Sequence, residues 1–358
     1  MIYQMASFAS VMSTIGNILL ALLLFALLIF IHELGHYTAG KIFKFKINEF
    51  SIGFGKALFS KKLKNGEIFS IRVIPLGGYC AFEGEDENSE VEGAFNNQAW
   101  WKRWIVLFAG VFFNFISAII VAIPLLMVWG DATPIIKTFD VNSPNHIEYN
   151  METLQEGDII VKVNGSKPTL LGGGITYLIN EQGDATYTVT VERNNELVDI
   201  SVTNYIINQD EDGNVTYGIG ITGYENLKYG FFEAVGRSVP FCFEMAWDCL
   251  KVLGNLIIGK VHLSNLGGPV TTISMIVEGS SISPIFLLVM FPVIAINLAV
   301  FNFLPFPALD GGRSVFVILE GIRRKPINQK LEQTIHSVGL YILLGFVILV
   351  DVLQIFVF

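Results

Sequence analysis

The chain has 358 residues, of which 52% are hydrophobic and only 15% are charged, whereas soluble domains carry roughly 25% charged residues. This composition excludes intrinsic disorder, which requires low hydrophobicity and high charge. A net charge of −9 argues against a nucleic-acid partner, because no basic stripe is present to meet phosphates. Three cysteines are too few for a disulfide framework or a thiolate zinc site. The composition therefore favours an integral membrane protein.

Four long apolar stretches predict membrane-spanning helices, each of which needs about 20 residues. The four stretches are residues 11–31, 104–130, 279–309 and 333–350, and the last continues past Asp351 to Phe358. A cleaved signal peptide is the alternative for the first stretch, but its apolar run is too long and no basic residue precedes it. We therefore expect a retained helix. A shorter uncharged run, 264–277, is either re-entrant or interfacial.

Lysine and arginine residues flank the predicted spans on one side only. They lie between Lys41 and Lys64 after the first span, at Lys102 and Arg103 before the second, and between Arg313 and Lys330 after the third. Because basic residues favour the cytoplasmic side, we expect a multi-pass protein of the cell (cytoplasmic) membrane with both chain ends outside. The long segment between the second and third spans then also lies outside.

Between the spans, the sequence favours β-structure in two places. Residues 47–82 predict strands rather than a helix, because 68–74 alternate imperfectly and are followed by Pro75 and Gly77-Gly78. Residues 131–225 predict a small β-rich domain, in which 186–192 and 197–203 form a hairpin around Asn194-Asn195. Six acidic residues within 83–92 indicate a solvated loop, and residues 231–263 favour an amphipathic helix.

Residues 32–36 are His-Glu-Leu-Gly-His, an HExxH pattern at the end of the first span. On a helix, positions i and i+4 share a face, so His32 and His36 can bind one metal ion. Imidazole suits Zn²⁺, which activates water and polarises a carbonyl while Glu33 takes the proton. The alternative is a chance match at a polar helix end. It is disfavoured because ionisable residues in membrane spans are costly and usually functional.

Catalytic zinc usually has three protein ligands and one open position. Asp310 is the favoured third ligand, because it ends the third span and is expected on the same side as HExxH. His146, His262 and His336 are alternatives by residue type, but we expect them outside or in the fourth span. Taken alone, Asp310 could instead cap the following helix. Asn302 could donate to an oxyanion or hold the substrate backbone, or it could only hydrogen-bond a neighbouring helix.

Together these motifs resemble the site-2 protease family of intramembrane zinc metalloproteases, in the bacterial branch that activates envelope-stress sigma factors. The resemblance rests on HELGH at 32–36, on Asn-Phe-Leu-Pro-Phe-Pro-Ala-Leu-Asp-Gly at 302–311 and on Ile-Pro-Leu-Gly-Gly-Tyr at 74–79. It covers almost the whole chain. It implies a multi-pass α-helical membrane protein with four transmembrane helices, a membrane-associated β-rich loop and an inserted β-rich PDZ-like domain.

The resemblance also implies roles for individual residues. In the family, two histidines and an aspartate bind Zn²⁺ and a glutamate activates water, which carries over to His32, His36, Asp310 and Glu33. Substrate binding carries over to Asn302 and, through a strand edge within about 67–82, to Ile71, Val73, Gly77 and Gly78. The implied partners are the lipid bilayer and single-pass membrane-protein substrates, typically a trimmed anti-sigma factor or a signal-peptide remnant.

Eight segments are expected along the chain. They are the first transmembrane helix with HExxH (1–36), a cytoplasmic loop with membrane-associated strands (37–97), the second transmembrane helix (98–130), an extracytoplasmic PDZ-like domain (131–225), an amphipathic or interfacial helical segment (226–278), the third transmembrane helix with its proline-rich motif (279–312), a cytoplasmic loop (313–332) and the fourth transmembrane helix (333–358). The metal site should therefore face the cytoplasm.

Two departures from the family pattern affect these expectations. Val111 stands where many members have proline, and residues 143–150 replace the usual start of the PDZ helix. A carboxylate-binding loop is not recognisable, so we favour a size filter over capture of free C-termini. Two rival functions are a catalytically inactive adaptor that binds partners through the PDZ-like domain and a metal transporter. The intact zinc motifs disfavour the first, and the lack of polar ligands in the first two spans disfavours the second.

Overall fold

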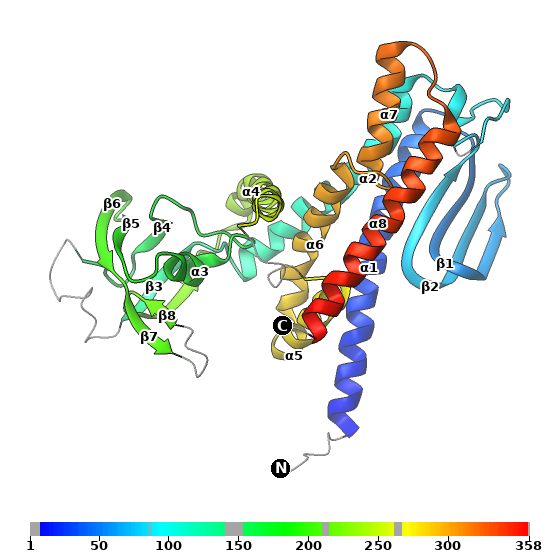
Figure 1. The fold of residues 1–358 in the computed structure, drawn as a ribbon. Helices are drawn as coiled ribbons and strands as arrows, with labels where there is room; N and C mark the ends of the chain where they lie inside the picture. Colours follow the sequence, from blue (N-terminus) through cyan, green and yellow to red (C-terminus); the bar gives the residue numbers. More distant parts are fainter. Residues whose placement is uncertain (1–7, 86, 140–152, 210–214, 261–266, 357–358) are drawn as a thin grey trace. The chain divides into compact units, whose positions relative to one another are not determined.

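The computed structural model describes residues 8–85, 87–139, 153–209, 215–260 and 267–356 (Figure 1). They form two compact units. The helical unit comprises residues Met1–Val121 and Leu250–Phe358, and the β-rich unit comprises Ala122–Cys249. The departure noted at 143–150 lies outside the described residues, as do His146 and His262.

Four helices among the described residues are long and apolar enough to cross a membrane, as the sequence predicted. They are α1 (Phe8–Ile42), α2 (Trp100–Val128), α6 (Ile285–Phe303) and α8 (Gln329–Phe356). α1 is longer than expected because it continues through HExxH and beyond it, which places both histidines inside regular helix.

The third predicted span, 279–309, is not one helix. α5 (Pro269–Ile282) ends before Ser283, and α6 begins after Pro284. Of the two, only α6 has the length and apolarity of a span. The short run at 264–277 is helical from Pro269 onward and belongs to α5, which Asn17 of α1 contacts by a 2.7 Å hydrogen bond to Ser281.

A β-sheet formed by β1 (Ile47–Lys62) and β2 (Ile68–Phe82) follows α1. The first part of β1 is paired on both sides, since Ser51 pairs with Tyr79 and also with Ser70. The second part of β1 then pairs with the start of β2. The end of β2 pairs on one side only, so it is an outer edge of this sheet.

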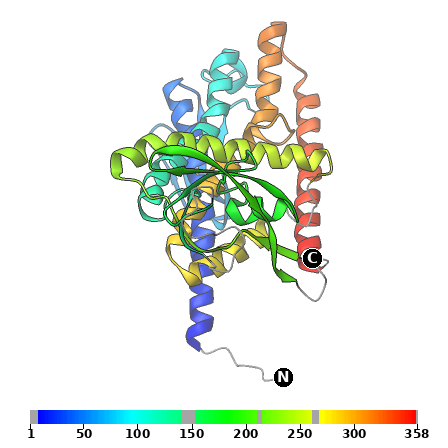
Figure 2. The same cartoon turned by 90° about the vertical axis from the view of Figure 1, so that its left-hand side faces the viewer.

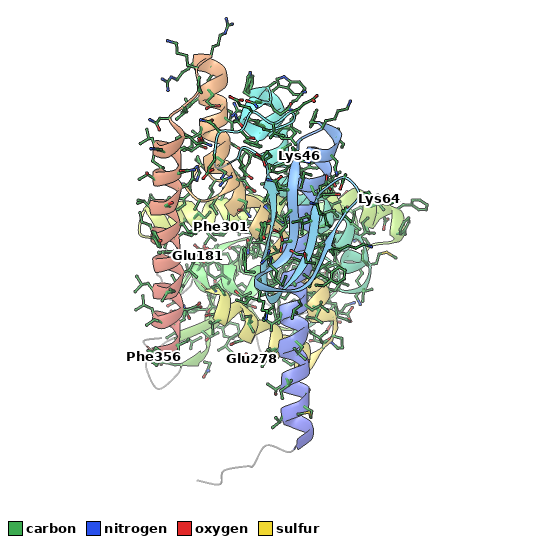
Figure 3. All side chains as sticks on the ribbon, turned by 90° about the vertical axis from the view of Figure 1, so that its right-hand side faces the viewer. Lys46, Lys64, Glu181, Glu278, Phe301 and Phe356 are labelled. Carbon is green, nitrogen blue, oxygen red and sulfur yellow. The ribbon has the colours of Figure 1, made fainter. Side chains whose placement is uncertain are left out.

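This sheet lies alongside the C-terminal half of α1, whereas the N-terminal half of α1 extends beyond it (Figures 1 and 3). Gly40 of α1 permits the close contact, because a Cβ there would lie 2.5 Å from the ring of Phe82. Phe82 also packs with Phe45 and with Phe95 of the short 3₁₀ helix η1 (Phe95–Asn97). An ion pair between Lys41 and Glu67 adds a polar contact between α1 and the residues that precede β2. The sheet is therefore fixed against the helix that carries HExxH.

The β-rich unit contains a five-stranded sheet in the order β6-β5-β4-β3-β9 and a separate pair, β7-β8. Its elements are β3 (Pro134–Phe139), β4 (Ile159–Val163), α3 (Gly174–Glu181), β5 (Thr186–Arg193), β6 (Glu196–Thr203), β7 (Tyr205–Gln209), β8 (Val215–Gly218) and β9 (Ile221–Asn226). Aliphatic side chains from the sheet and from α3 form one core, which includes Ile160, Val189 and Leu178.

The predicted hairpin is confirmed. β5 and β6 pair without a bulge from Thr186–Thr203 to Arg193–Glu196. Asn194 and Asn195 have φ angles of 53° and 65°, as a type I′ turn requires.

The predicted amphipathic helix is α4 (Phe231–Ile257), which runs across one side of the β-rich unit (Figure 2). Its buried side includes Cys242 and Cys249, and both thiols are free. Seven residues apart on one helix, they are two turns from each other and too far apart to bridge, so they act as packing residues.

Candidate metal centre

The two HExxH histidines lie on the face of α1 that packs against α2. Two glycines bring the helices together, because a Cβ on Gly35 would lie 2.3 Å from the carbonyl oxygen of Ala109. A Cβ on Gly110 would lie 2.4 Å from His36 Nε2 and 2.7 Å from His32 Cε1. The imidazoles therefore rest directly on the backbone of α2. Sequence reasoning missed this role of Gly35 and Gly110, since it depends on which residues of two distant helices meet.

Asp310 reaches the same point from the other end of the chain. It is the first residue of α7 (Asp310–Arg323), whose N-cap is Leu309 and has no side-chain capping bond. The Asp310 carboxylate instead approaches both histidines, with Oδ2 at 2.9 Å from His32 Nε2 and 3.3 Å from His36 Nε2. The structure thus brings together the three residues that the sequence selected as ligands, and the position of the carboxylate disfavours the capping alternative.

These three side chains could hold a metal ion. Their donor atoms form a triangle with sides of 2.9, 3.2 and 3.3 Å. A tetrahedral zinc ion with bonds of about 2.0–2.1 Å separates its ligands by about 3.3–3.4 Å. The donor set, two imidazoles and one carboxylate, also matches catalytic zinc sites. The residues therefore fit zinc in both size and chemistry, and three ligands leave one tetrahedral position open.

The other ring nitrogen of each histidine faces α2. His36 Nδ1 lies 2.8 Å from the carbonyl oxygen of Val106, so Nδ1 donates and Nε2 keeps its lone pair for a metal. His32 Nδ1 lies 3.3 Å from the side-chain amide of buried Asn114. Asn114 Oδ1 has no hydrogen-bond partner among the described residues. Turning this amide by half a rotation would let Oδ1 accept from His32 Nδ1, which would satisfy both groups and fix the same tautomer.

A cavity of about 290 Å³ opens beside the donor triangle. Its lining residues come from α1, β2, α2, α6 and the start of α7, and they are Ile29, His32, Glu33, Gly77, Gly78, Asn114, Leu298, Asn302, Ala308 and Asp310. Glu33 is not part of the donor triangle. Its side chain lies against the end of β2, since a Cβ on Gly78 would be 3.2 Å from Glu33 Cγ. This position suits a base that acts on a molecule in the cavity.

The predicted substrate-binding residues are not all at this cavity. Gly77, Gly78 and Asn302 line it, whereas Ile71 and Val73 do not. Ile71 pairs with both Ile52 and Phe59, so it lies inside the sheet and not at the edge that the sequence analysis expected. Val73 is 52% exposed and away from the donor triangle. Only the end of β2 therefore combines an outer edge with a place at the cavity.

Asn302 also lines a second cavity. The second, of about 300 Å³, is lined almost entirely by apolar side chains of α2, α6 and α7, among them Trp104, Phe108 and Val315. Asn302 and Asp310 line both cavities. Among the described residues the Asn302 amide makes no hydrogen bond to protein, so the alternative of helix–helix bonding gains no support.

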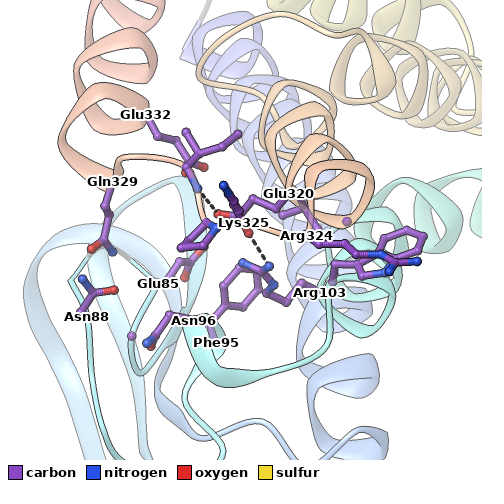
Figure 4. A pocket seen from close by; sticks show the side chains of 16 residues that line it. Glu85, Asn88, Phe95, Asn96, Arg103, Glu320, Arg324, Lys325, Gln329 and Glu332 are labelled. Carbon is purple, nitrogen blue, oxygen red and sulfur yellow. Dashed lines mark hydrogen bonds and ion pairs between the residues drawn. The ribbon is translucent and has the colours of Figure 1, made fainter.

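A larger cavity, of about 580 Å³, is lined by other residues, none of which belongs to the donor triangle (Figure 4). Polar side chains dominate its wall, and two of them, Arg103 and Glu320, form an ion pair. Glu320 also accepts a 2.8 Å hydrogen bond from the backbone N–H of Ile327. These bonds connect the start of α2 with the loop between α7 and α8, so the cavity wall is built from groups that already stabilise the fold.

Comparison with known proteins gives a family match over most of the chain. The model of peptidase family M50 matches residues 20–346, a range that contains all the residues of the donor triangle. The relatives include proteins named "Putative zinc metalloprotease". One from Fusobacterium nucleatum is 33% identical over 93% of this chain and 97% of its own. One from Clostridium perfringens is 32% identical over 94% of this chain and 97% of its own. One from Rickettsia conorii is 32% identical over 90% of this chain and 94% of its own.

Proposed function

The chain belongs to peptidase family M50, the site-2 protease family, and is a zinc metalloprotease; from this premise we propose that it hydrolyses peptide bonds within the transmembrane segments of other membrane proteins. One observation carries the proposal. The donor triangle is built from α1, which is itself long and apolar enough to cross a membrane, and from Asp310, which follows α6. A protease with two ligands on one such helix and the third shortly after another has its reacting centre where membrane-embedded substrates can reach it.

The chemistry divides between the metal and the protein. Zinc held by His32, His36 and Asp310 would lower the pKa of water and polarise the scissile carbonyl. Glu33 is placed beside the cavity to accept the proton of the attacking water and to pass it to the leaving amine. Asn302 is placed to donate its amide to the substrate backbone or to the developing oxyanion.

Substrate binding needs an unwound chain. A helical peptide bond is already hydrogen-bonded and shielded, so its backbone groups must find new partners in a place that excludes water. Gly77 and Gly78 lie at the cavity, next to the end of β2 that pairs on one side only. Pairing of the substrate with this edge would satisfy its backbone. We place the substrate here and not along Ile71, whose strand position is already paired on both sides.

The substrate class follows from the family resemblance. We propose single-pass membrane proteins, such as a trimmed anti-sigma factor or a signal-peptide remnant. The β-rich unit is proposed as a PDZ-like, extracytoplasmic size filter that excludes substrates with large outer domains, and the metal centre is proposed to face the cytoplasm. The rival function, a catalytically inactive adaptor, would not need Glu33 beside a complete donor triangle.

The central test compares wild-type and Glu33→Gln proteins. We expect purified wild-type protein to bind one zinc ion and to cleave a membrane peptide in detergent or liposomes. Glu33→Gln should keep the zinc and lose hydrolysis, because Glu33 is not a ligand. In cells, mass spectrometry should show membrane peptides that accumulate only with the variant and so identify substrates. Full activity of Glu33→Gln would contradict the mechanism.

Sidedness can be tested with single cysteines. Glu196→Cys, at the exposed β5–β6 turn, should react with an impermeant maleimide added outside, whereas Lys62→Cys at the end of β1 should not. Native thiols should give little background, since burial raises the pKa of Cys242 to about 12 and of Cys249 to about 11. Burial also raises the pKa of Cys80. The reverse labelling pattern would show that the orientation inferred from the basic residues is wrong.

A further inference from the structure

We propose that His336 of α8 is a positioning residue for the third metal ligand, because its Nδ1 holds the turn that presents Asp310. The proposal rests on the zinc site of the proposed function and extends it to a helix that contributes no ligand. The turn runs from Leu304 to Leu309, between the end of α6 and the start of α7.

The backbone N–H groups of this turn are almost all satisfied within it. Pro305 and Pro307 have no N–H to donate. The N–H groups of Leu304, Phe306 and Leu309 donate to carbonyl oxygens of Phe301, Leu304 and Phe306. The remaining N–H, that of Ala308, donates to His336 Nδ1 at 2.9 Å. A single imidazole thus completes the hydrogen bonding of the segment that precedes Asp310.

Ala308 is also where the turn is strained. Its φ angle is 80°, in the left-handed region that disfavours any residue with a Cβ. Such a conformation persists only where the surroundings hold it. Ala308 also lines the cavity beside His32 and Glu33. A change of conformation here would therefore move the cavity wall and the residue two positions later, which is the ligand.

A second contact from α8 presses on the same turn. Gly339 lies three residues after His336 and so on the same face of the helix. A Cβ on Gly339 would be 2.4 Å from Pro307 Cβ and 2.9 Å from its carbonyl oxygen. The ring of Phe316 in α7 packs against His336, with ring centroids 5.4 Å apart. α8 therefore holds the turn through one hydrogen bond and one close backbone approach.

The hydrogen bond also determines which substitution can replace the histidine. Because Nδ1 accepts, the neutral ring carries its proton on Nε2. An asparagine can offer Oδ1 near the position of Nδ1, whereas a leucine of similar bulk offers no acceptor and leaves the Ala308 N–H without a partner.

The experiment measures zinc affinity rather than turnover. The full-length protein in detergent is stripped with a chelator and titrated with zinc against a competing indicator, and Co²⁺ absorption reports the ligand geometry. Loss of an outer partner of a metal ligand typically costs about 10–100-fold in affinity. We expect a loss in that range and an altered Co²⁺ spectrum for His336→Leu and Gly339→Ala. His336→Asn should remain close to wild type. Gly345→Ala, on the same helix with nothing within 4 Å of a Cβ, is the matched control.

The outcomes separate the proposals. Wild-type zinc affinity in His336→Leu, or an equal loss in the leucine and asparagine variants, would overturn the positioning role and leave the protease assignment intact. A wild-type protein that binds no zinc would overturn both. If His336→Leu does not fold, His336→Ala, which also removes the acceptor but adds no bulk, is compared with His336→Asn in the same way. Folding is checked by the unfolding temperature of the stripped variants.

Discussion

The metal centre holds a half-buried carboxylate and the β-rich unit holds buried ones, and these carboxylates have different partners. In the β-rich unit, Asp158 accepts two 2.7 Å hydrogen bonds from Arg193, and Asp131 accepts one of 2.7 Å from Arg237. At the metal centre, Asp310 faces two imidazole nitrogens, and no lysine or arginine of the described chain pairs with it.

This difference separates structural charge from functional charge. The charge of a carboxylate beside a guanidinium is balanced, and its lone pairs accept hydrogen bonds from the guanidinium. Such a pair therefore requires no bound ion. At the metal centre, two imidazole lone pairs and a carboxylate converge within 3.3 Å. No positively charged side chain of the described residues balances them. A bound cation would provide the positive charge. The two kinds of carboxylate should therefore respond differently when their charge is removed.

The largest effect is expected at Asp310. Asp310→Asn keeps the shape but removes the charge and weakens the ligand, so zinc content and hydrolysis should both fall. The loss should exceed the roughly 10–100-fold cost of an outer-shell change. Zinc is measured by elemental analysis and hydrolysis with a membrane peptide. Retention of full zinc content by Asp310→Asn would remove it from the ligand set.

The matched change in the other unit is Asp158→Asn. It removes the carboxylate charge that Arg193 pairs with in the interior, which should destabilise the β-rich unit by about 3 kcal/mol. Hydrogen exchange of the β4 and β5 amides in the full-length protein measures this opening free energy. Zinc content should not change. If Asp158→Asn lost as much zinc as Asp310→Asn, the proposed difference between structural and metal-binding carboxylates would be wrong.

A smaller effect is expected at Asn114, which contacts His32 from α2. Asn114→Ala removes the partner of Nδ1 and frees the ring to turn, so zinc affinity should fall about tenfold. Asn114→Asp offers a better acceptor and should keep the affinity. An alanine variant that binds zinc as tightly as the wild type would show that packing against Gly110 alone orients the imidazole.

Local patterns explain what the sequence could predict of this site. His32 and His36 share a helix face by spacing alone, and the β5–β6 hairpin follows from Asn194-Asn195. Contacts between elements that are distant in the sequence could not be predicted in this way. An alternating pattern does not show that β1 pairs on both sides, which places Ile71 inside the sheet. It also does not show that Gly110 approaches the histidines.

The break between α5 and α6 was missed for a related reason. Proline is tolerated inside apolar helices here, as Pro124 in α2 and Pro292 in α6 show. Pro284 therefore looked no different in sequence, although it separates two helices. Only packing decides which proline ends a helix in such a chain.

The smallest predicted effect concerns Glu244 of α4, which pairs with Arg237 and Lys167. Burial disfavours ionisation of Glu244, but hydrogen bonds from Arg237 and Lys167 outweigh it and hold the pKa of Glu244 below its usual value. A carboxyl group whose pKa is lowered by folding stabilises the fold above its unfolded pKa, about 4.3 for glutamate. That contribution is lost as the pH falls through the lower, folded value.

We therefore expect Glu244→Gln to destabilise the docking of α4 by on the order of 1 kcal/mol at neutral pH. The difference between wild type and variant should shrink as the pH falls below about 4.3. Unfolding temperatures of full-length protein in detergent between neutral and acid pH measure it. Glu225→Gln, whose side chain is 66% exposed beside Lys137, should show a weaker dependence. A difference that stayed constant with pH would mean that Glu244 acts through its shape and not through its charge, unlike the other paired carboxylates of this unit.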